Sequence, residues 1–180
     1  GGADKWVAIF GAGFNNNATT DYGSAIFVID MADGGKVLQS IAVTDNNDPN
    51  SNPVTNKVMN SVPSSLVPVT ADSTTLIDYY GALVYFADYE GKLWKLNLSD
   101  QGTLYDLQYI FDAEATEANE RRVMFDIGAS VDANTNKLWL YYGTGNQQAL
   151  ASESATLQNK LYGIKDKNFP SYNTAAVSVT

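Results

Sequence analysis

The sequence predicts an all-β fold made of repeated antiparallel meanders, and three observations support this prediction. Residues 81–100 contain two apolar, β-favouring runs joined by the turn cluster Asp88-Tyr89-Glu90-Gly91, which is the pattern of a β-hairpin. Related hairpins occupy residues 6–35 and 138–168. Each hairpin carries an aromatic residue at the matching place, at spacings of 67 and 68 residues: Phe27, Trp94 and Tyr162. A regularly repeated hairpin predicts β-propeller-like blades, in which sheets pack radially.

We expect one partial propeller domain over residues 1–180, with about three blades that belong to a larger propeller. The repeat units cover roughly residues 5–60, 61–122 and 123–169, and a tail follows at 170–180. A single continuous sheet is the alternative, but the long linkers between hairpins favour separate blades. Three blades do not close a ring, so the open sheet edges predict self-association or edges covered by the chain's own loops.

The first unit contains a strand that runs into Gly11-Ala12-Gly13. A strand, a G-x-G turn and an acid about 20 residues later (Asp30) make up much of a dinucleotide-binding fingerprint. However, the connection at residues 15–23 is too short for a crossover helix. The third unit repeats the same strand ending at Tyr142-Gly143-Thr144-Gly145. We therefore interpret the glycines as a turn of the repeat.

The remaining elements follow from alternating apolar residues and turn clusters. Residues 112–122 have helical composition, and they form either a short helix or a solvated loop with exposed charges. The other expected strands span residues 24–30, 36–43, 103–111, 123–131, 138–143 and 160–165; the expected turns and loops span 32–35, 44–60, 132–136 and 147–159.

Several side chains can be assigned to the core or to the surface from their positions. Trp6, Trp94 and Trp139 each lie in an apolar strand, so we expect core positions for them rather than sugar-stacking positions. Asp88 and Glu90 lie in a tight turn, where we expect solvated carboxylates. Catalysis by these two acids would need an environment other than a solvated turn.

The composition excludes several kinds of function. The chain has 44% hydrophobic and 17% charged residues, which is typical of a folded domain. With 11 basic and 20 acidic residues, the net charge of −9 disfavours nucleic acid as a partner. The absence of His and Cys excludes Ser-His-Asp and Cys-His nucleophiles and the usual zinc ligands. No apolar run approaches the ~18 residues of a membrane-spanning helix.

Oxygen-bearing side chains recur before the central hairpin. Thr70, Asp72, Thr74 and Asp78 occupy relative positions 1, 3, 5 and 9. Side chains at alternating positions can converge on calcium, which takes 6–8 oxygen ligands. Only two of these four residues are carboxylates, and the glycine that usually makes the sharp turn of a calcium loop is absent.

Three motifs together resemble the PilY/PilC family, whose members are associated with the tip of bacterial type IV pili. WVAIFGAGFNN followed by SAIFVIDMADGGKV is similar to a family blade of the form VVFGNGYNS…LYVVDLATG. VYFADYEGKLWKLNLS is similar to AYAGDLxGNLWKFDLS, and LWLYYGTGNQ followed by KLYGIKD is similar to YFGTGKY…FYGIWD. The motifs occur in the family's order and extend over residues 6–166.

The resemblance implies a non-enzymatic module of pilus biogenesis, at the pilus tip or elsewhere on the cell surface. It implies pilus assembly, control of retraction and adhesion, with pilins or minor pilins and a host or abiotic surface receptor as partners. It also implies a calcium loop just before the central hairpin, which acts as a switch. The family's acidic positions fall on Thr70, Asp72, Thr74 and Asp78, so two carboxylates are replaced here. A weak, relocated or lost calcium site all remain open.

Two other classes of function remain open from the residues alone. An enzymatic propeller of the quinoprotein or glycosidase type could use an acid pair such as Asp88 and Glu90. A carbohydrate-binding or scaffold propeller could use exposed tryptophans instead. A change in tryptophan fluorescence on a glycan panel would separate the carbohydrate-binding class from the others.

Overall fold

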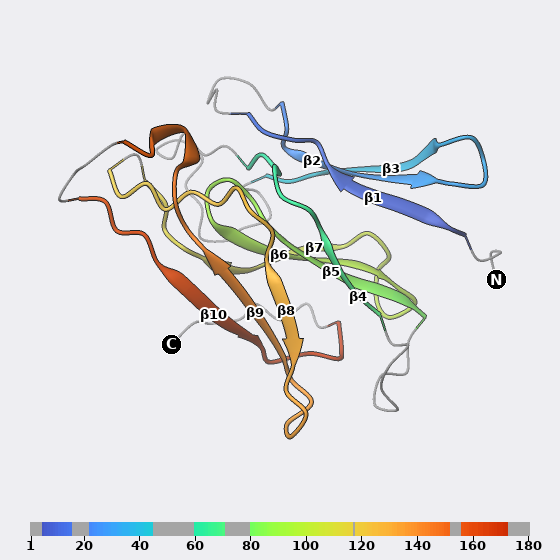
Figure 1. Ribbon diagram of the computed structural model, residues 1–180. Helices are drawn as coiled ribbons and strands as arrows, with labels where there is room; N and C mark the ends of the chain where they lie inside the picture. Colours follow the sequence, from blue (N-terminus) through green and yellow to red (C-terminus); the bar gives the residue numbers. More distant parts are fainter. Residues whose placement is uncertain are drawn as a thin grey trace.

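The fold of the described residues is all-β in the computed structural model (Figure 1). The structure describes residues 5–15, 22–44, 60–70, 80–116, 118–151 and 156–172. One 3₁₀ turn, η2 (Gln147–Ala149), is the helical element within these ranges. The strands are β1 (Val7–Gly11), β2 (Ala25–Asp30), β3 (Lys36–Ala42), β4 (Val67–Thr70), β5 (Gly81–Ala87), β6 (Lys92–Ser99), β7 (Leu107–Asp112), β8 (Gly128–Val131), β9 (Leu138–Gly143) and β10 (Leu161–Asp166).

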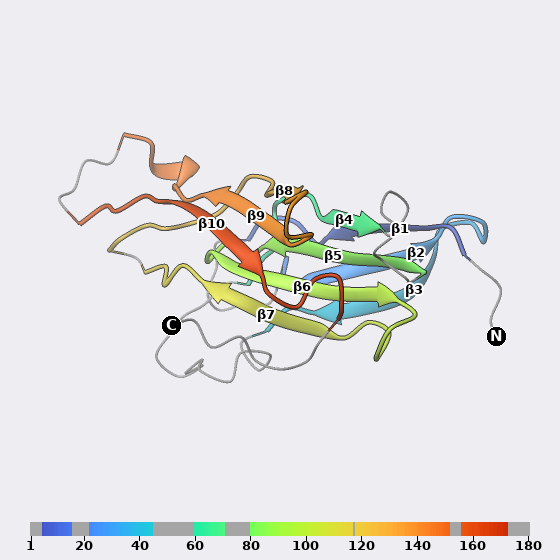
Figure 2. The same cartoon turned by 90° about the horizontal axis from the view of Figure 1, so that it is seen from below.

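The strands form three antiparallel meander sheets. Sheet 1 has the order β1-β2-β3, sheet 2 the order β4-β5-β6-β7 and sheet 3 the order β8-β9-β10. Figures 1 and 2 show the sheets stacked in chain order, with sheet 2 between the other two. This arrangement confirms the predicted all-β class and is consistent with propeller-like blades. It also confirms that β1 and β2 form an antiparallel hairpin rather than a dinucleotide-binding β-α-β unit.

The sequence repeat is also a repeat of backbone geometry. In each of the three repeated hairpins, the residue that follows the first strand donates its amide N–H to a backbone carbonyl. The accepting residue lies two positions before the matched aromatic residue. The pairs are Ala12 to Ala25 at 2.8 Å, Asp88 to Lys92 at 3.0 Å and Thr144 to Lys160 at 2.9 Å. In the second and third hairpins the same two residues form a second hydrogen bond in the opposite direction. The side chain of Asp88 accepts the amide N–H of Lys92 at 2.9 Å, and the side chain of Thr144 accepts that of Lys160 at 2.8 Å.

The same kind of turn lies at or near the end of the second strand of each hairpin. The side-chain oxygen of an Asp or Asn accepts the amide N–H two residues further on, which forms an Asx turn. The distances are 3.0 Å for Asp30 to Ala32, 2.9 Å for Asn97 to Ser99 and 2.9 Å for Asp166 to Asn168. Asp30 also pairs with Lys5. Strands β2 and β10 end at the Asp of this turn, whereas β6 continues to Ser99, two residues past Asn97.

Two apolar clusters fill the spaces between the sheets. The first cluster joins sheet 1 to sheet 2 and contains Ile26, Val28, Phe86 and Trp94. The second joins sheet 2 to sheet 3 and contains Leu83, Tyr85, Leu140 and Tyr142. Sheet 2 is therefore buried on both faces. Trp94 is fully buried, which confirms its predicted core position.

Two of the three tryptophan assignments need correction. Trp6 was predicted to lie in the core but is 85% exposed, because it lies just before β1, where no other sheet of the described residues packs on it. Trp139 is only half-buried, on the side of sheet 3 that faces away from sheet 2. Both residues satisfy the apolar strand pattern, but the pattern does not show which faces another sheet covers.

The element boundaries differ from the prediction in four places. Strand β4 was not predicted. Strand β7 starts at Leu107 rather than at residue 103, because Thr103–Asp106 turns back onto Asn97. Strand β8 begins only at Gly128. Over residues 113–122, no helix forms in the described part, and the chain is an irregular connector.

Candidate functional site

The predicted calcium segment lies almost entirely outside the described residues. Thr70 is the last residue of β4, where it pairs with Ala82 and is exposed. Asp72, Thr74 and Asp78 lie outside the described ranges. Among the residues that the structure does describe, no group of three or more acidic side chains gathers in a way that could hold a metal ion.

The D-x-N-x-N stretch at residues 132–136 forms a turn, as predicted. The two carboxylate oxygens of Asp132 accept the amide N–H of Asn134 at 2.9 Å and the hydroxyl of Thr135 at 2.6 Å. These donors lower the pKa of Asp132 below its usual value. The carboxylate of Asp132 therefore stabilises the turn between β8 and β9.

The main polar cluster lies at the turn between β5 and β6, and here the sequence prediction was wrong. Asp88 and Glu90 were expected to be solvated, but both side chains are buried. Oδ1 of Asp88 accepts the amides of Glu90 at 3.0 Å and Lys92 at 2.9 Å, and Oδ2 accepts the indole N–H of Trp94 at 2.9 Å. Burial outweighs these donors and raises the pKa of Asp88 to about 7.

The turn is buried because the two connectors between sheets enclose it. The amide of Tyr89 donates to the carbonyl of Ser61 at 2.8 Å, and the carbonyl of Tyr89 accepts the amide of Val123 at 3.0 Å. Ser61 lies in the connector from sheet 1 to sheet 2, and Val123 in the connector from sheet 2 to sheet 3. Gly91 has a positive φ of 79°, and a Cβ there would lie 2.8 Å from the Cβ of Ala113.

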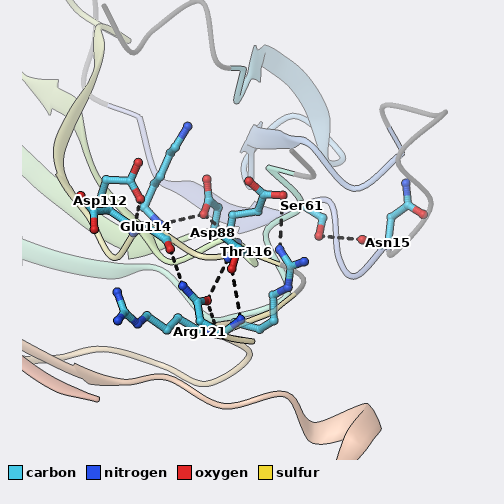
Figure 3. A network of polar contacts seen from close by, with 11 residues as sticks. Asn15, Ser61, Asp88, Asp112, Glu114, Thr116 and Arg121 are labelled. Atoms are coloured by element: carbon cyan, nitrogen blue, oxygen red, sulfur yellow. Dashed lines mark hydrogen bonds and ion pairs between the residues drawn. The ribbon is translucent and has the colours of Figure 1, made fainter. Parts of the chain in front are cut away.

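Two arginines of the second connector complete the cluster, which Figure 3 shows in part. Arg122 pairs with Glu90 at 3.4 Å and lies 5.1 Å from the centre of the Tyr89 ring. Arg121 donates to the carbonyl of Ala113 at 3.1 Å and to the side chain of Gln158 at 2.9 Å. The charge run was predicted to be an exposed face. Its arginines are instead buried, because each one meets acceptors from distant parts of the chain.

The chemistry of this cluster is that of a structural junction. Asp88 is fully buried and holds three donors, and Glu90 is engaged by an arginine. A glycosidase needs two carboxyl groups that flank a substrate, and these two side chains are covered by the connectors. Satisfied buried polar networks fix one arrangement of a fold. The cluster therefore fixes the relative positions of the sheets.

A second buried charge pair links sheet 2 to sheet 3. Nζ of Lys95 on β6 lies 2.8 Å from Oδ2 of Asp166 at the end of β10, and both side chains are buried. The hydroxyl of Tyr85 donates to the same oxygen at 2.8 Å, and Lys95 also donates to the carbonyl of Ser171 at 3.1 Å. In the sequence, Lys95 is a polar residue that interrupts an apolar strand, and no local pattern predicts its pairing with Asp166.

Comparison with known proteins finds one informative relative. The chain is 26% identical to a protein named "Type IV pilus biogenesis factor PilY1 homolog" from Xylella fastidiosa (strain Temecula1 / ATCC 700964), over 176 residues. The match covers 92% of this chain and 11% of that relative, so the chain spans about a tenth of the relative's length. No family model matches the chain, and no solved structure matches it. Within the described residues, no helix has the length and apolarity needed to span a bilayer.

Proposed function

We propose that the chain is a non-enzymatic, propeller-type binding module that acts in type IV pilus biogenesis at the cell surface. The observation that carries this proposal is the similarity to a pilus biogenesis factor along 92% of the chain. Each of the three repeated hairpins that carry the family motifs lies in a different sheet of the fold, so the similarity extends to all three sheets.

The geometry of the acidic residues supports a binding role over hydrolytic chemistry. The acid pair on which a glycosidase reading depends, Asp88 and Glu90, is buried and engaged by main-chain amides and by Arg122. Binding modules of this architecture use surface loops on a rigid scaffold. In this proposal the loops contact pilins or minor pilins, and attachment to a host or abiotic surface is a second role of the same module.

A chimera tests the pilus proposal. The matching segment of the Xylella relative is replaced by this chain, and surface pili are measured in cells that lack the native gene. We expect surface pili to be restored. A matched chimera that carries Trp94→Ala, which removes a core side chain, should not restore them. A folded, surface-exposed chimera that leaves the cells without pili would contradict the proposal.

We further propose that calcium binds at Thr70, Asp72, Thr74 and Asp78. The alternating oxygen ligands and the net charge of −9 support cation binding at this segment. At 100 times the dissociation constant, a ligand that binds only the folded state adds about 2.7 kcal/mol. For a chain of 180 residues, this corresponds to a rise in melting temperature of roughly 5–10 °C.

The measurement is a thermal melt in millimolar calcium and in EDTA. The wild type should melt higher in calcium, and Asp78→Ala should melt at the same temperature in both. Asp33→Ala, which removes an exposed carboxylate of the β2–β3 turn, is the matched control and should keep the shift. A wild type with equal melting temperatures in both solutions would mean that this segment has lost the ion.

A further inference from the structure

Strand β10 lies at an edge of sheet 3, whereas the equivalent strands of the other two sheets each have two neighbours. The matched aromatic residues Phe27, Trp94 and Tyr162 lie in β2, β6 and β10, so these three strands are equivalent. Strand β2 pairs with β1 and β3, and β6 pairs with β5 and β7. Within the described residues, β10 pairs with β9 alone (Figure 1). Sheet 3 therefore lacks a counterpart of β3 and β7.

The backbone of β10 presents hydrogen-bonding groups to this open edge. The amide N–H of Thr144 donates to the carbonyl of Lys160 at 2.9 Å, so the backbone of Lys160 points toward β9. Along an antiparallel pair, successive residues direct their backbone groups to opposite edges of the strand. The register between β9 and β10 has no shift, so Leu161, Gly163 and Lys165 direct theirs away from β9. The amides and carbonyls of these three residues are suited to a further strand.

Sheet 2 shows what pairs with the equivalent groups. Asn97 is the equivalent of Lys165, because each lies three residues after the matched aromatic residue of its strand. The amide N–H of Asn97 donates to the carbonyl of Asp106 at 2.9 Å, and its carbonyl accepts the amide N–H of Tyr105 at 2.8 Å. Both partners lie directly before β7. In sheet 2, the chain that follows the strand therefore turns back and pairs with this edge.

The chain after β10 also returns to the end of the strand where such a turn must finish. Nζ of Lys95 donates to the carbonyl of Ser171 at 3.1 Å and also pairs with Asp166, the last residue of β10. The hydroxyl of Tyr172 donates to Asp106 at 2.8 Å, directly before β7. The chain at Tyr172 is therefore placed to start a strand that runs antiparallel to β10.

The next eight residues have the length and composition of a strand. Residues 173–180, NTAAVSVT, lie outside the described ranges. At about 3.3 Å per residue, this segment is long enough to follow the six residues of β10. Val177 and Val179 alternate with Ser178 and Thr180, which is the period-2 pattern of a strand with one apolar face. The segment contains no Pro, no Gly and no charged side chain.

We propose that residues 173–180 add to the open edge of β10 as the fourth, antiparallel strand of sheet 3. Sheet 3 then has four strands, as sheet 2 has. An extended segment of a partner protein fits an open edge as well. The chain's own segment is favoured because it begins next to Tyr172, and this tether gives it a high effective concentration at the edge. The added strand also covers an edge that would otherwise favour aggregation.

Amide hydrogen exchange followed by NMR on the whole chain tests the proposal. The variant is Val177→Pro/Ser178→Pro. Because neighbouring N–H groups point to opposite edges, one of these prolines removes a donor toward β10 in either register. The N–H groups of Leu161, Gly163 and Lys165 should exchange more than tenfold more slowly in the wild type than in this variant. The matched control Val177→Ala/Ser178→Ala keeps both N–H groups and should keep the slow exchange.

The amides of Tyr162 and Ile164 point toward β9 and should stay protected in all three proteins, which checks that sheet 3 remains folded. The wild type already discriminates by itself. Unprotected exchange at Leu161, Gly163 and Lys165 beside protected Tyr162 and Ile164 overturns the proposal. Equal protection in the wild type and the proline variant also overturns it, because another segment then covers the edge. So does protection that appears only at high protein concentration, because a second copy then supplies the strand.

Discussion

Trp94→Ala should lower the free energy of unfolding by about 3–5 kcal/mol, which is the usual loss for a large core aromatic residue. Trp94 is fully buried between sheets 1 and 2, and its ring contacts Tyr109 edge-on at 6.2 Å between centroids. The substitution also removes the indole donor that Oδ2 of Asp88 accepts at 2.9 Å. The buried carboxylate then loses a partner, which adds to the cost.

Denaturant unfolding measures this loss, and two further variants make the result specific. Trp94→Phe keeps most of the apolar surface but lacks the N–H donor, so it should lose about 1–3 kcal/mol. Tyr80→Ala alters an exposed aromatic residue at the start of the same hairpin and should change stability by less than ~0.5 kcal/mol. A loss below ~1 kcal/mol for Trp94→Ala would place this side chain outside the core.

The hairpins could be predicted from the sequence because their signals are local. Alternating apolar residues and clusters such as Asp88-Tyr89-Glu90-Gly91 specify strands and turns within a few residues. Strand β4 was missed because Pro68 in its middle argues against a strand. Proline is nevertheless tolerated there, since β4 is the edge strand of sheet 2.

The buried charges could not be predicted because their partners are distant in the chain. Asp166 is 71 residues from Lys95, and Glu90 is 32 residues from Arg122. A local pattern classifies such residues as solvated, since unpaired charges are rarely buried. The same limit explains the error at Trp6. The strand pattern marks an apolar face, and only the packing of the sheets decides whether another element covers it.

The ion pair between Lys95 and Asp166 carries the second large prediction. Lys95→Met should lower the free energy of unfolding by about 3–5 kcal/mol, because it leaves the Asp166 carboxylate buried without its cation. Asp166→Asn should cost a similar amount, since the ammonium group of Lys95 then lacks its carboxylate. Burial already lowers the pKa of Lys95, and the proximity of Asp166 opposes that effect.

The double variant Lys95→Met/Asp166→Asn decides whether the two charges act as a pair. With both charges removed, neither is left uncompensated, so the double variant should lose clearly less than the sum of the single losses. Asn can keep the Oδ1 contacts with the amides of Asn168 at 2.9 Å and Phe169 at 3.2 Å. Losses that simply add in denaturant melts would show that the two side chains stabilise the fold independently.

The position of this pair distinguishes one junction between sheets from the other. Val28, on the face of sheet 1 that packs on sheet 2, is the equivalent of Lys95, because each residue directly follows the matched aromatic residue of its hairpin. The first junction is therefore apolar at the place where the second contains an ion pair. The sheet that packs on this face of sheet 2 must supply a carboxylate to pair with Lys95, and sheet 3 supplies it with Asp166. The buried charge pair therefore distinguishes the junction between sheets 2 and 3 from the junction between sheets 1 and 2.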